Sequence, residues 1–316
     1  MRQWIIAGVL AALCVAGTAW LALSPPSASR QPTQPPPLRV LLIPADGGTE
    51  SGTLADYRPI FDAVARSTGM RFDLKVAQSY GGVVEAMCNN AADIAFVGSV
   101  TYLQAQKRGC AELLAVAVKS GRSVYYSGLF VRADSPVQSI ADLRGQRVAF
   151  GDVNSTSAFI FPVAMLLDAG IDPVRDLSAV RMTGTHANSL AALINGEVDA
   201  AALSFDSYDK AVRANVPGAR NLRVIARSEP IPYPPLIANT RLKPAVRGRL
   251  RTAFEKVDRT AGVTPEMIRG YGGARVDGYV GHVPANHFDP ATRKMAQVTP
   301  ALKDEMLRKS AERQAR

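Results

Sequence analysis

The chain has 316 residues, of which 47% are hydrophobic and 20% are charged, and its formal net charge is +10. This composition excludes a disordered or collagen-like chain and predicts a globular protein of one large or two modest domains. The positive charge suits an anionic ligand or membrane surface. Because the Lys and Arg residues are scattered and no basic helix with interleaved aromatics occurs, we do not expect a nucleic-acid partner.

The N-terminal segment has the pattern of an export signal. Arg2 supplies a positive start, and residues 4–23 are uncharged and mostly apolar. A run of this length fits either a cleaved signal peptide or a retained anchor, so we expect one of these over residues 1–24. The protein is then periplasmic, or tethered to the outer face of the cytoplasmic membrane. Residues 25–37 are rich in Pro and predict an extended linker.

Strands and helices alternate over the first half of the chain. Residues 44–53 are expected to form a Gly-rich loop after the first strand. Nearly continuous apolar strands that alternate with helices predict a parallel sheet with helices on both faces. The expected strands are 38–43, 72–76, 93–98 and 113–118, and the helices between them include 57–68 and 100–107.

A second unit of the same kind follows. The strand expected at 125–131 leads out of the first unit, and the strand at 222–226 leads back. Two crossings between two α/β units predict a hinged clam-shell with a ligand cleft between its lobes. We expect the first part of lobe 1 at 38–134 and lobe 2 at 135–225. Residues 226–316 then return to lobe 1 and add C-terminal helices.

A quasi-repeat links the two units. Residues 89–96 and 195–201 both contain a turn, an Asp and an apolar strand, and both follow a helix. This similarity predicts that Asp93 and Asp199 hold equivalent positions in the two lobes.

Three consecutive hydroxyl residues stand out in the second unit. A short strand at 147–150 ends in the turn residues 151–154, and Ser155, Thr156 and Ser157 then precede an apolar helical pattern. Hydroxyls beside the first N–H groups of a helix form a site for an oxyanion, although a single one of them is more often an ordinary N-cap. No Gly-Lys-Ser/Thr follows, so this is not a Walker A loop.

The same stretch carries a family resemblance. Residues 142–157, with Pro162 and residues 170–173, resemble the central segment of the phosphate/phosphite/phosphonate-binding proteins, which are solute receptors of ABC transporters. The resemblance extends over about residues 38–279 and implies the two-lobed type 2 periplasmic-binding-protein fold. In that family the Ser-Thr-Ser triplet holds the phosphonate oxygens. The family's usual Gly after the triplet is Ala158 here.

The resemblance implies further ligand residues. Tyr80 lies in a segment that resembles the one whose Tyr faces the ligand, and Tyr125 falls where a second aromatic is expected, with Tyr126 as the alternative. His186 matches a His at a helix start that donates to the phosphonate. Taken alone, these residues would more often be core aromatics and a surface or capping His.

Asp206 falls where a carboxylate receives the ligand's amino group in the aminoethylphosphonate-binding members of the family. A carboxylate repels a phosphonate unless a cation lies between them, which hints at a zwitterionic ligand. Those members carry a further acid in the loop that is 231–235 here, and this loop has none. The organic substituent of the ligand therefore stays open, and Asp206 is alternatively a solvated loop residue.

The cysteines are Cys14, Cys88 and Cys110. Cys14 lies in the export segment, and the other two each end a helix before successive strands. In an exported protein they are expected to form one disulfide. Three scattered His residues without ligand spacing give no reason to expect a metal site, and no cofactor is expected.

These observations favour a solute-binding protein that captures a phosphonate-type anion and delivers it to an ABC permease as a monomer, without catalysis. One alternative is a membrane-tethered sensor or accessory domain of the same fold for another small anion. A second is a hydrolase that uses Ser155 or Ser157 with His186. No Gly-x-Ser-x-Gly elbow supports the hydrolase.

Overall fold

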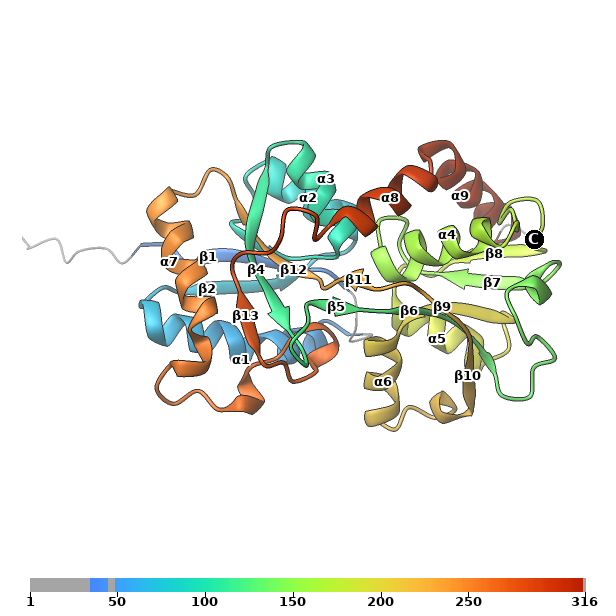
Figure 1. Cartoon of the computed structure of the whole chain (residues 1–316), viewed down its shortest axis with the longest axis horizontal. Helices are drawn as coiled ribbons and strands as arrows, with labels where there is room; N and C mark the ends of the chain where they lie inside the picture. Colours follow the sequence, from blue (N-terminus) through green and yellow to red (C-terminus); the bar gives the residue numbers. More distant parts are fainter. Residues whose placement is uncertain (1–34, 45–48, 315–316) are drawn as a thin grey trace, which may run out of the picture. The chain divides into compact units, whose positions relative to one another are not determined.

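The computed structural model describes residues 35–44 and 49–314, and residues 37–316 form one compact unit. The predicted export segment and most of the linker lie outside the described residues. The compact unit contains two large sheets, each the centre of a lobe, and one two-stranded sheet (Figure 1). Of the helices that the structure describes, none combines the length and apolarity needed to cross a membrane.

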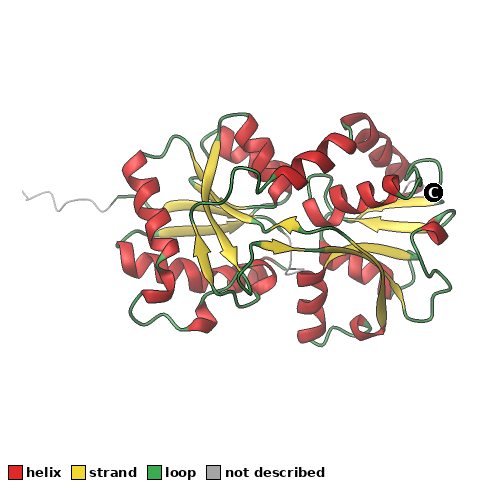
Figure 2. Ribbon diagram, viewed as in Figure 1, coloured by secondary structure: helices red, strands yellow, loops and turns green. Residues whose placement is uncertain are grey.

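Lobe 1 is built on a six-stranded sheet in the order β13-β4-β12-β3-β1-β2. β1 pairs in parallel with β2 and β3, whereas β12 is antiparallel to β3 and β4. Helices lie on both faces of this sheet, as its apolar strands predict (Figure 2). The strands are β1 (Leu38–Leu42), β2 (Phe72–Val76), β3 (Ile94–Phe96), β4 (Ala111–Val118), β12 (Pro235–Asn239) and β13 (Gly278–Val280), and the helices are α1 (Glu50–Thr68), α2 (Tyr80–Cys88), α3 (Ser99–Lys107) and α7 (Pro244–Glu255).

Lobe 2 is built on a five-stranded sheet in the order β10-β6-β9-β7-β8. The last helix of the chain, α9 (Pro300–Gln314), packs on β8, where the Met182 N–H donates to Ser310 Oγ at 3.0 Å. The C-terminal helices thus reach lobe 2. The strands are β6 (Ser127–Arg132), β7 (Arg147–Phe150), β8 (Ala179–Met182), β9 (Ala200–Ser204) and β10 (Leu222–Arg227), and the helices are α4 (Phe161–Asp168), α5 (His186–Ile194), α6 (Phe205–Arg213) and α8 (Asp289–Gln297), which precedes α9.

The two lobes repeat one topology. The order β2-β1-β3-β12-β4 in lobe 1 corresponds to β8-β7-β9-β6-β10 in lobe 2, with one antiparallel strand at the same place in each. In both lobes an Arg near the start of one strand binds the Asp before a neighbouring parallel strand. Arg39 in β1 binds Asp93 before β3 at 2.8 Å, and Arg147 in β7 binds Asp199 before β9 at 2.6 Å. The hydrogen bond from Arg147 lowers the pKa of the Asp199 carboxyl. The predicted equivalence of Asp93 and Asp199 is confirmed.

The first crossing between the lobes lies earlier than the sequence suggested. The apolar run that we expected to be one strand of lobe 1 is two strands, β5 (Val124–Tyr125) and β6. β5 pairs with β11 (Ile231–Pro232) to form the two-stranded link between the lobes, and β6 joins the sheet of lobe 2. An apolar pattern marks a buried strand but does not identify the sheet that buries it.

Helix α1 begins at Glu50, within the segment that we expected to be a loop. Thr49 is its N-cap, and Thr49 Oγ1 accepts from the Gly52 N–H at 3.1 Å. Glu50 lies in the first turn, where a negative charge is favourable. A capping Thr and an acid outweigh the low helix propensity of Gly52 and Thr53.

Cys88 and Cys110, the pair expected from the sequence, form a disulfide with Cα atoms 4.8 Å apart. Cys88 is the last residue of α2, and Cys110 directly precedes β4. The bond therefore ties the C-terminal end of a helix to the start of a strand within lobe 1.

Candidate functional site

The predicted ligand residues of lobe 2 lie at one edge of its sheet. β7 pairs in parallel with β8 and with β9, so the carboxyl ends of these three strands meet at the same edge. The loop after β7 carries residues 155–157, the loop after β8 leads to His186, and β9 leads directly into α6 with Asp206. Parallel pairing thus brings together residues that are far apart in the sequence.

The three hydroxyl residues open one continuous helix. Ser155 is the N-cap, residues Thr156–Ile160 form a π-helical turn, and α4 follows. Ser155 Oγ accepts from the Ala158 N–H at 3.1 Å, so this residue is a true helix cap. Ser155, Thr156 and Ser157 are each at most 2% exposed.

Thr156 reaches the other lobe. Thr156 Oγ1 accepts from the Val100 N–H at 3.0 Å, in the first turn of α3. The N-cap of α3 is Gly98, which has no side chain to do this, and a Cβ on Gly98 would lie 2.9 Å from Thr156 Oγ1. A hydroxyl of lobe 2 therefore caps a helix of lobe 1.

Ser157 contacts His186. The distance from Ser157 Oγ to His186 Nε2 is 3.5 Å, and His186 Nδ1 accepts from the Ser204 N–H at 3.2 Å. Complete burial lowers the pKa of His186 to about 3, so the ring is neutral at ordinary pH. A neutral ring that accepts at Nδ1 carries its proton on Nε2. Nε2 is then a donor toward Ser157 Oγ.

The oxygens of all three hydroxyls act as hydrogen-bond acceptors within the protein. Each oxygen accepts from an N–H group: that of Ala158, of Val100 or of the His186 ring. A hydroxyl group has one proton to donate and two lone pairs to accept with. With N–H donors directed at the oxygens, each hydroxyl keeps its own proton for a partner that only accepts. An ionised oxyanion is such a partner.

The burial of His186 predicts how stability changes with pH. Its folded pKa of about 3 lies below its ordinary value of 6.5, so between these values the unfolded chain takes up a proton that the folded protein does not. Stability is therefore full above about pH 6.5 and falls as pH decreases. Between pH 7 and pH 5 we expect the free energy of unfolding to fall by about 2 kcal/mol more in the wild type than in His186→Gln. Urea unfolding of both proteins at the two pH values measures this difference, and parallel pH dependences would contradict the neutral buried ring.

The predicted tyrosines lie on the lobe 1 side and in the link. Tyr125 in β5 is 3% exposed, and its ring centroid lies 5.4 Å from that of Tyr271, which is 6.2 Å from the ring of His186. The alternative residue, Tyr126, instead packs under the Arg227 guanidinium at 3.7 Å. Of the two tyrosines, Tyr125 is thus the one that packs against Tyr271, the neighbour of His186.

Tyr80 is the first residue of α2 and is 2% exposed. Its N–H donates to Asp152 Oδ2 at 3.2 Å, so the loop after β7 touches the N-terminus of α2 as well as that of α3. Burial raises the pKa of the Asp152 carboxyl, while hydrogen bonds from the backbone of Asn154 and Tyr80 oppose this. Asn154 Oδ1 also accepts from Gln104 Nε2 at 2.8 Å. Hydrogen bonds from the loop that carries the triplet therefore link lobe 2 to lobe 1.

Asp206 has a partner that the sequence analysis did not foresee. Its carboxylate, 6% exposed as a residue, binds Lys119 Nζ at 2.9 Å. Lys119 directly follows β4, so this ion pair joins lobe 1 to lobe 2. Asp206 is neither a solvated loop acid nor an unpaired carboxylate.

Three further residues around the triplet were missed. Ser127 Oγ donates to the backbone oxygen of Ser157 at 2.5 Å, Ser204 supplies the N–H that orients His186, and Tyr271 O–H lies 3.4 Å from Ser204 Oγ. Ser204 could have been found, since it ends the strand beside β7. Tyr271 begins a short 3-10 helix, Tyr271–Gly273, between α7 and β13, and carries no sequence signal. That any residue of this region touches a ligand stays a prediction.

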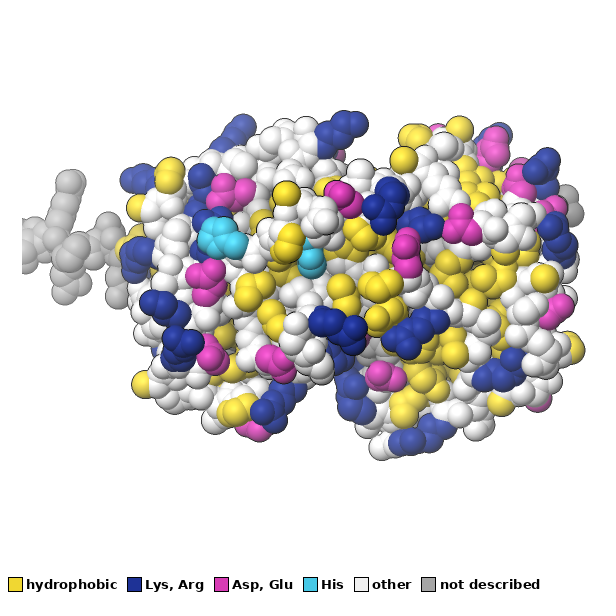
Figure 3. Space-filling view, in the orientation of Figure 1, with side chains coloured by type: hydrophobic (Ala, Val, Ile, Leu, Met, Phe, Trp, Pro, Cys, Tyr) yellow, Lys and Arg dark blue, Asp and Glu magenta, His cyan; other side chains and the backbone are white. Residues whose placement is uncertain are grey.

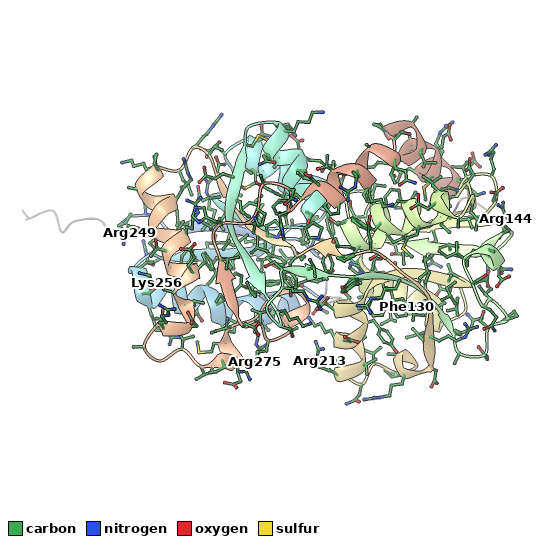
Figure 4. The ribbon with its side chains drawn as sticks, viewed as in Figure 1. Phe130, Arg144, Arg213, Arg249, Lys256 and Arg275 are labelled. Atoms are coloured by element: carbon green, nitrogen blue, oxygen red, sulfur yellow. A yellow bond between two sulfur atoms is a disulfide. The ribbon has the colours of Figure 1, made fainter. Side chains whose placement is uncertain are left out.

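Positively charged side chains lie near the boundary between the lobes. On the face shown in Figure 3, several Lys and Arg side chains lie along the boundary between the lobes. Arg213, labelled in Figure 4, donates from α6 to the backbone oxygen of Gly272 at 3.3 Å.

His186 and Ser207 also line a cavity of about 170 Å³ between α5 and α6. Among the residues that the structure describes, no three His, Cys, Asp or Glu side chains gather as ligands for a metal ion.

Comparisons with known proteins agree with this arrangement. Residues 48–282 match the family model described as "ABC transporter, phosphonate, periplasmic substrate-binding protein". The chain is 30% identical over 260 residues to the phosphate-import protein PhnD of Mycolicibacterium smegmatis. The aligned region covers 77% of this chain and 79% of that protein. The chain is also 27% identical over 209 residues to the phosphonates-binding periplasmic protein of Escherichia coli, covering 65% and 62% of the two chains.

Solved structures show the fold. A binding protein component of an ABC phosphonate transporter from Pseudomonas aeruginosa superposes with a TM-score of 0.72 at 22% identity, over 89% of this chain and 98% of that one. PhnD1 from Prochlorococcus marinus, in complex with methylphosphonate, gives a TM-score of 0.71 at 16% identity, over 83% and 97%. The predicted two-lobed type 2 periplasmic-binding-protein fold is confirmed. With a family model that matches most of its length and a relative at 30% identity, the chain belongs to the family of periplasmic substrate-binding proteins of phosphonate ABC transporters.

Proposed function

We propose that this protein captures a small phosphorus oxyanion on Ser155, Thr156, Ser157 and His186 and delivers it to an ABC permease. The observation that carries this proposal is the set of three buried hydroxyls, each of which already accepts from an N–H. Such hydroxyls are donors toward a ligand that only accepts hydrogen bonds. Phosphite and phosphonate dianions have three acceptor oxygens and no O–H donor, and the phosphate dianion has three such oxygens beside one hydroxyl.

The relatives support the phosphorus class and leave the substituent open. One is named for phosphate import, another for phosphonates, and a solved structure of the same fold holds methylphosphonate. A phosphorus oxyanion is the chemistry that these three names share. We extend that shared chemistry, and not any single ligand, to this protein.

The hydrogen bonds between the lobes support capture by closure. Thr156 caps α3 and Asp152 accepts from the start of α2, so the loop that carries the triplet contacts lobe 1. We infer that an open form lacks these contacts and that ligand binding shifts the protein toward the closed form. A permease can then recognise the closed form. Tyr80 and Tyr125 would cover the ligand from lobe 1 and the link.

We also infer that the protein is not a hydrolase that uses Ser157 and His186. A general base must accept the serine proton at Nε2, and its Nδ1–H is usually held by a carboxylate. Here Nδ1 accepts from the Ser204 N–H, so the neutral ring already has its proton on Nε2. His186 is arranged as a donor.

The periplasmic family and the Cys88–Cys110 disulfide support a location outside the cytoplasm. We infer that residues 1–24 export the chain, either as a cleaved signal or as an anchor.

Thermal unfolding of the purified protein with a panel of anions tests the proposed function. The panel contains phosphate, phosphite, methylphosphonate, sulfate and acetate. A ligand that binds only the folded state stabilises it by about 2.7 kcal/mol at 100 times its Kd. We expect at least one phosphorus anion to raise the Tm more than sulfate or acetate does, since the relatives are named for phosphate and phosphonates. No change with any phosphorus anion would contradict the proposal.

A further inference from the structure

We propose that Lys119 fills, at Asp206, the place that a ligand's ammonium group would take, so that the site favours phosphorus oxyanions without an amine. This inference rests on the proposed function and names the ligand class of the same site. It starts from one contact, the ion pair of Lys119 Nζ with Asp206 Oδ1 at 2.9 Å.

Asp206 lies beside the candidate site. It is the second residue of α6, which follows β9 directly, and Ser204 at the end of β9 holds His186. The next residue, Ser207, contacts the Tyr271 hydroxyl at 3.3 Å. A ligand held by the triplet and His186 that extended toward α6 would therefore meet the Asp206 carboxylate.

Lys119 neutralises the charge of the Asp206 carboxylate. The Asp206 side chain is only 7% exposed, whereas that of Lys119 is 41% exposed. The carboxylate is therefore buried, and the Lys119 side chain that pairs with it is partly in solvent. A buried carboxylate without a partner is costly and would repel an anionic ligand. Lys119 removes both problems for an anion that has no positive group of its own.

A ligand ammonium must compete with this arrangement. To reach Asp206 it has to displace an ammonium that is already tethered to the chain, and it gains only an equivalent ion pair in exchange. Asp209, one turn further along α6, does not offer a free alternative. Burial and the charge of Asp206 raise its pKa, while the charges of Arg213 and Lys119 lower it. The Asp206 carboxylate thus already has a basic partner, whereas Arg213 and Lys119 offset the raised pKa of the Asp209 carboxyl only in part.

A second ion pair between the lobes provides a matched control. Lys210 on α6 binds Asp56 on α1, with the basic residue in lobe 2 and the acid in lobe 1. Both pairs join the lobes, so loss of either is expected to weaken closure and to lower the affinity for every ligand. Only loss of Lys119 exposes Asp206 to an amine.

Calorimetric titration of the purified protein with methylphosphonate and 2-aminoethylphosphonate tests the inference. The wild type is expected to bind 2-aminoethylphosphonate no more tightly than methylphosphonate, since the ligand ammonium gains only the ion pair with Asp206 that Lys119 loses. In Lys119→Met the affinity ratio is expected to shift toward the amino compound by at least about tenfold. In Lys210→Met both affinities are expected to fall together, with the ratio unchanged.

A wild type that prefers 2-aminoethylphosphonate, or a ratio that Lys119→Met leaves unchanged, would overturn the inference. Asp206→Asn is the second variant, for use if Lys119→Met does not fold. The inference expects it to leave the ratio near that of the wild type, whereas a selective loss of the amino compound would show that Asp206 binds the amine itself. A wild type that binds no phosphorus anion, phosphate and phosphite included, would instead contradict the proposed function.

Discussion

Replacing Ser155 and Thr156 together with Ala is expected to weaken binding of the phosphorus anion at least about 100-fold, because a hydrogen bond to a charged oxygen is worth about 1.5–3 kcal/mol. Two such bonds are lost. The same change removes the acceptors of the Ala158 and Val100 N–H groups. Loss of a cap costs about 1 kcal/mol of stability, so the double variant is expected to fold with a lower Tm. Calorimetry measures the affinity, and urea unfolding measures the stability.

A capping residue outside the site controls for the loss of stability. Thr299 Oγ1 accepts from the Leu302 N–H at 3.2 Å at the start of α9. Thr299→Ala therefore loses the same kind of bond, and we expect it to lower the Tm without changing the affinity. If the Ser155→Ala, Thr156→Ala protein is folded and binds as tightly as the wild type, the assignment of the triplet as the anion site is wrong.

Removal of the disulfide by Cys88→Ser and Cys110→Ser is expected to lower the free energy of unfolding by about 3 kcal/mol, because the bond closes a loop of 22 residues in the unfolded chain. Guanidinium unfolding of the double variant and the wild type measures the difference. The wild type treated with a thiol reductant should show a similar decrease.

The same variant should keep its ligand affinity. The disulfide lies at the C-terminal end of α2, whereas Tyr80 lies at its N-terminal end. A folded double variant with unchanged stability would contradict the predicted role of the disulfide. A loss of affinity at unchanged stability would indicate that the bond positions α2 for the ligand, which the structure does not lead us to expect.

Local patterns explain why much of the fold could be predicted. Short apolar runs marked most strands of the two large sheets, although β13 was not predicted. The ion pairs Arg39–Asp93 and Arg147–Asp199 show that the short sequence repeat reflects a structural one. The family resemblance grouped residues 155–157 with His186, and the parallel pairing of β7 with β8 explains why they lie at one edge of the sheet.

Contacts between the lobes could not be predicted in the same way. Lys119 and Asp206 are 87 residues apart and come from different lobes, and no periodicity links them. Tyr126 packs against Arg227 and Tyr125 against Tyr271, and β6 lies between β9 and β10 in the sheet of lobe 2. Each of these outcomes is decided by tertiary packing, which a local pattern does not encode.

A crystal structure of the protein with methylphosphonate tests the central claim most directly. We expect the phosphonate oxygens within hydrogen-bond distance of the hydroxyls of Ser155, Thr156 and Ser157 and of His186 Nε2, with Lys119 still bound to Asp206. Phosphonate density elsewhere, with the triplet contacting only protein atoms, would show that these hydroxyls are helix caps and not the ligand site.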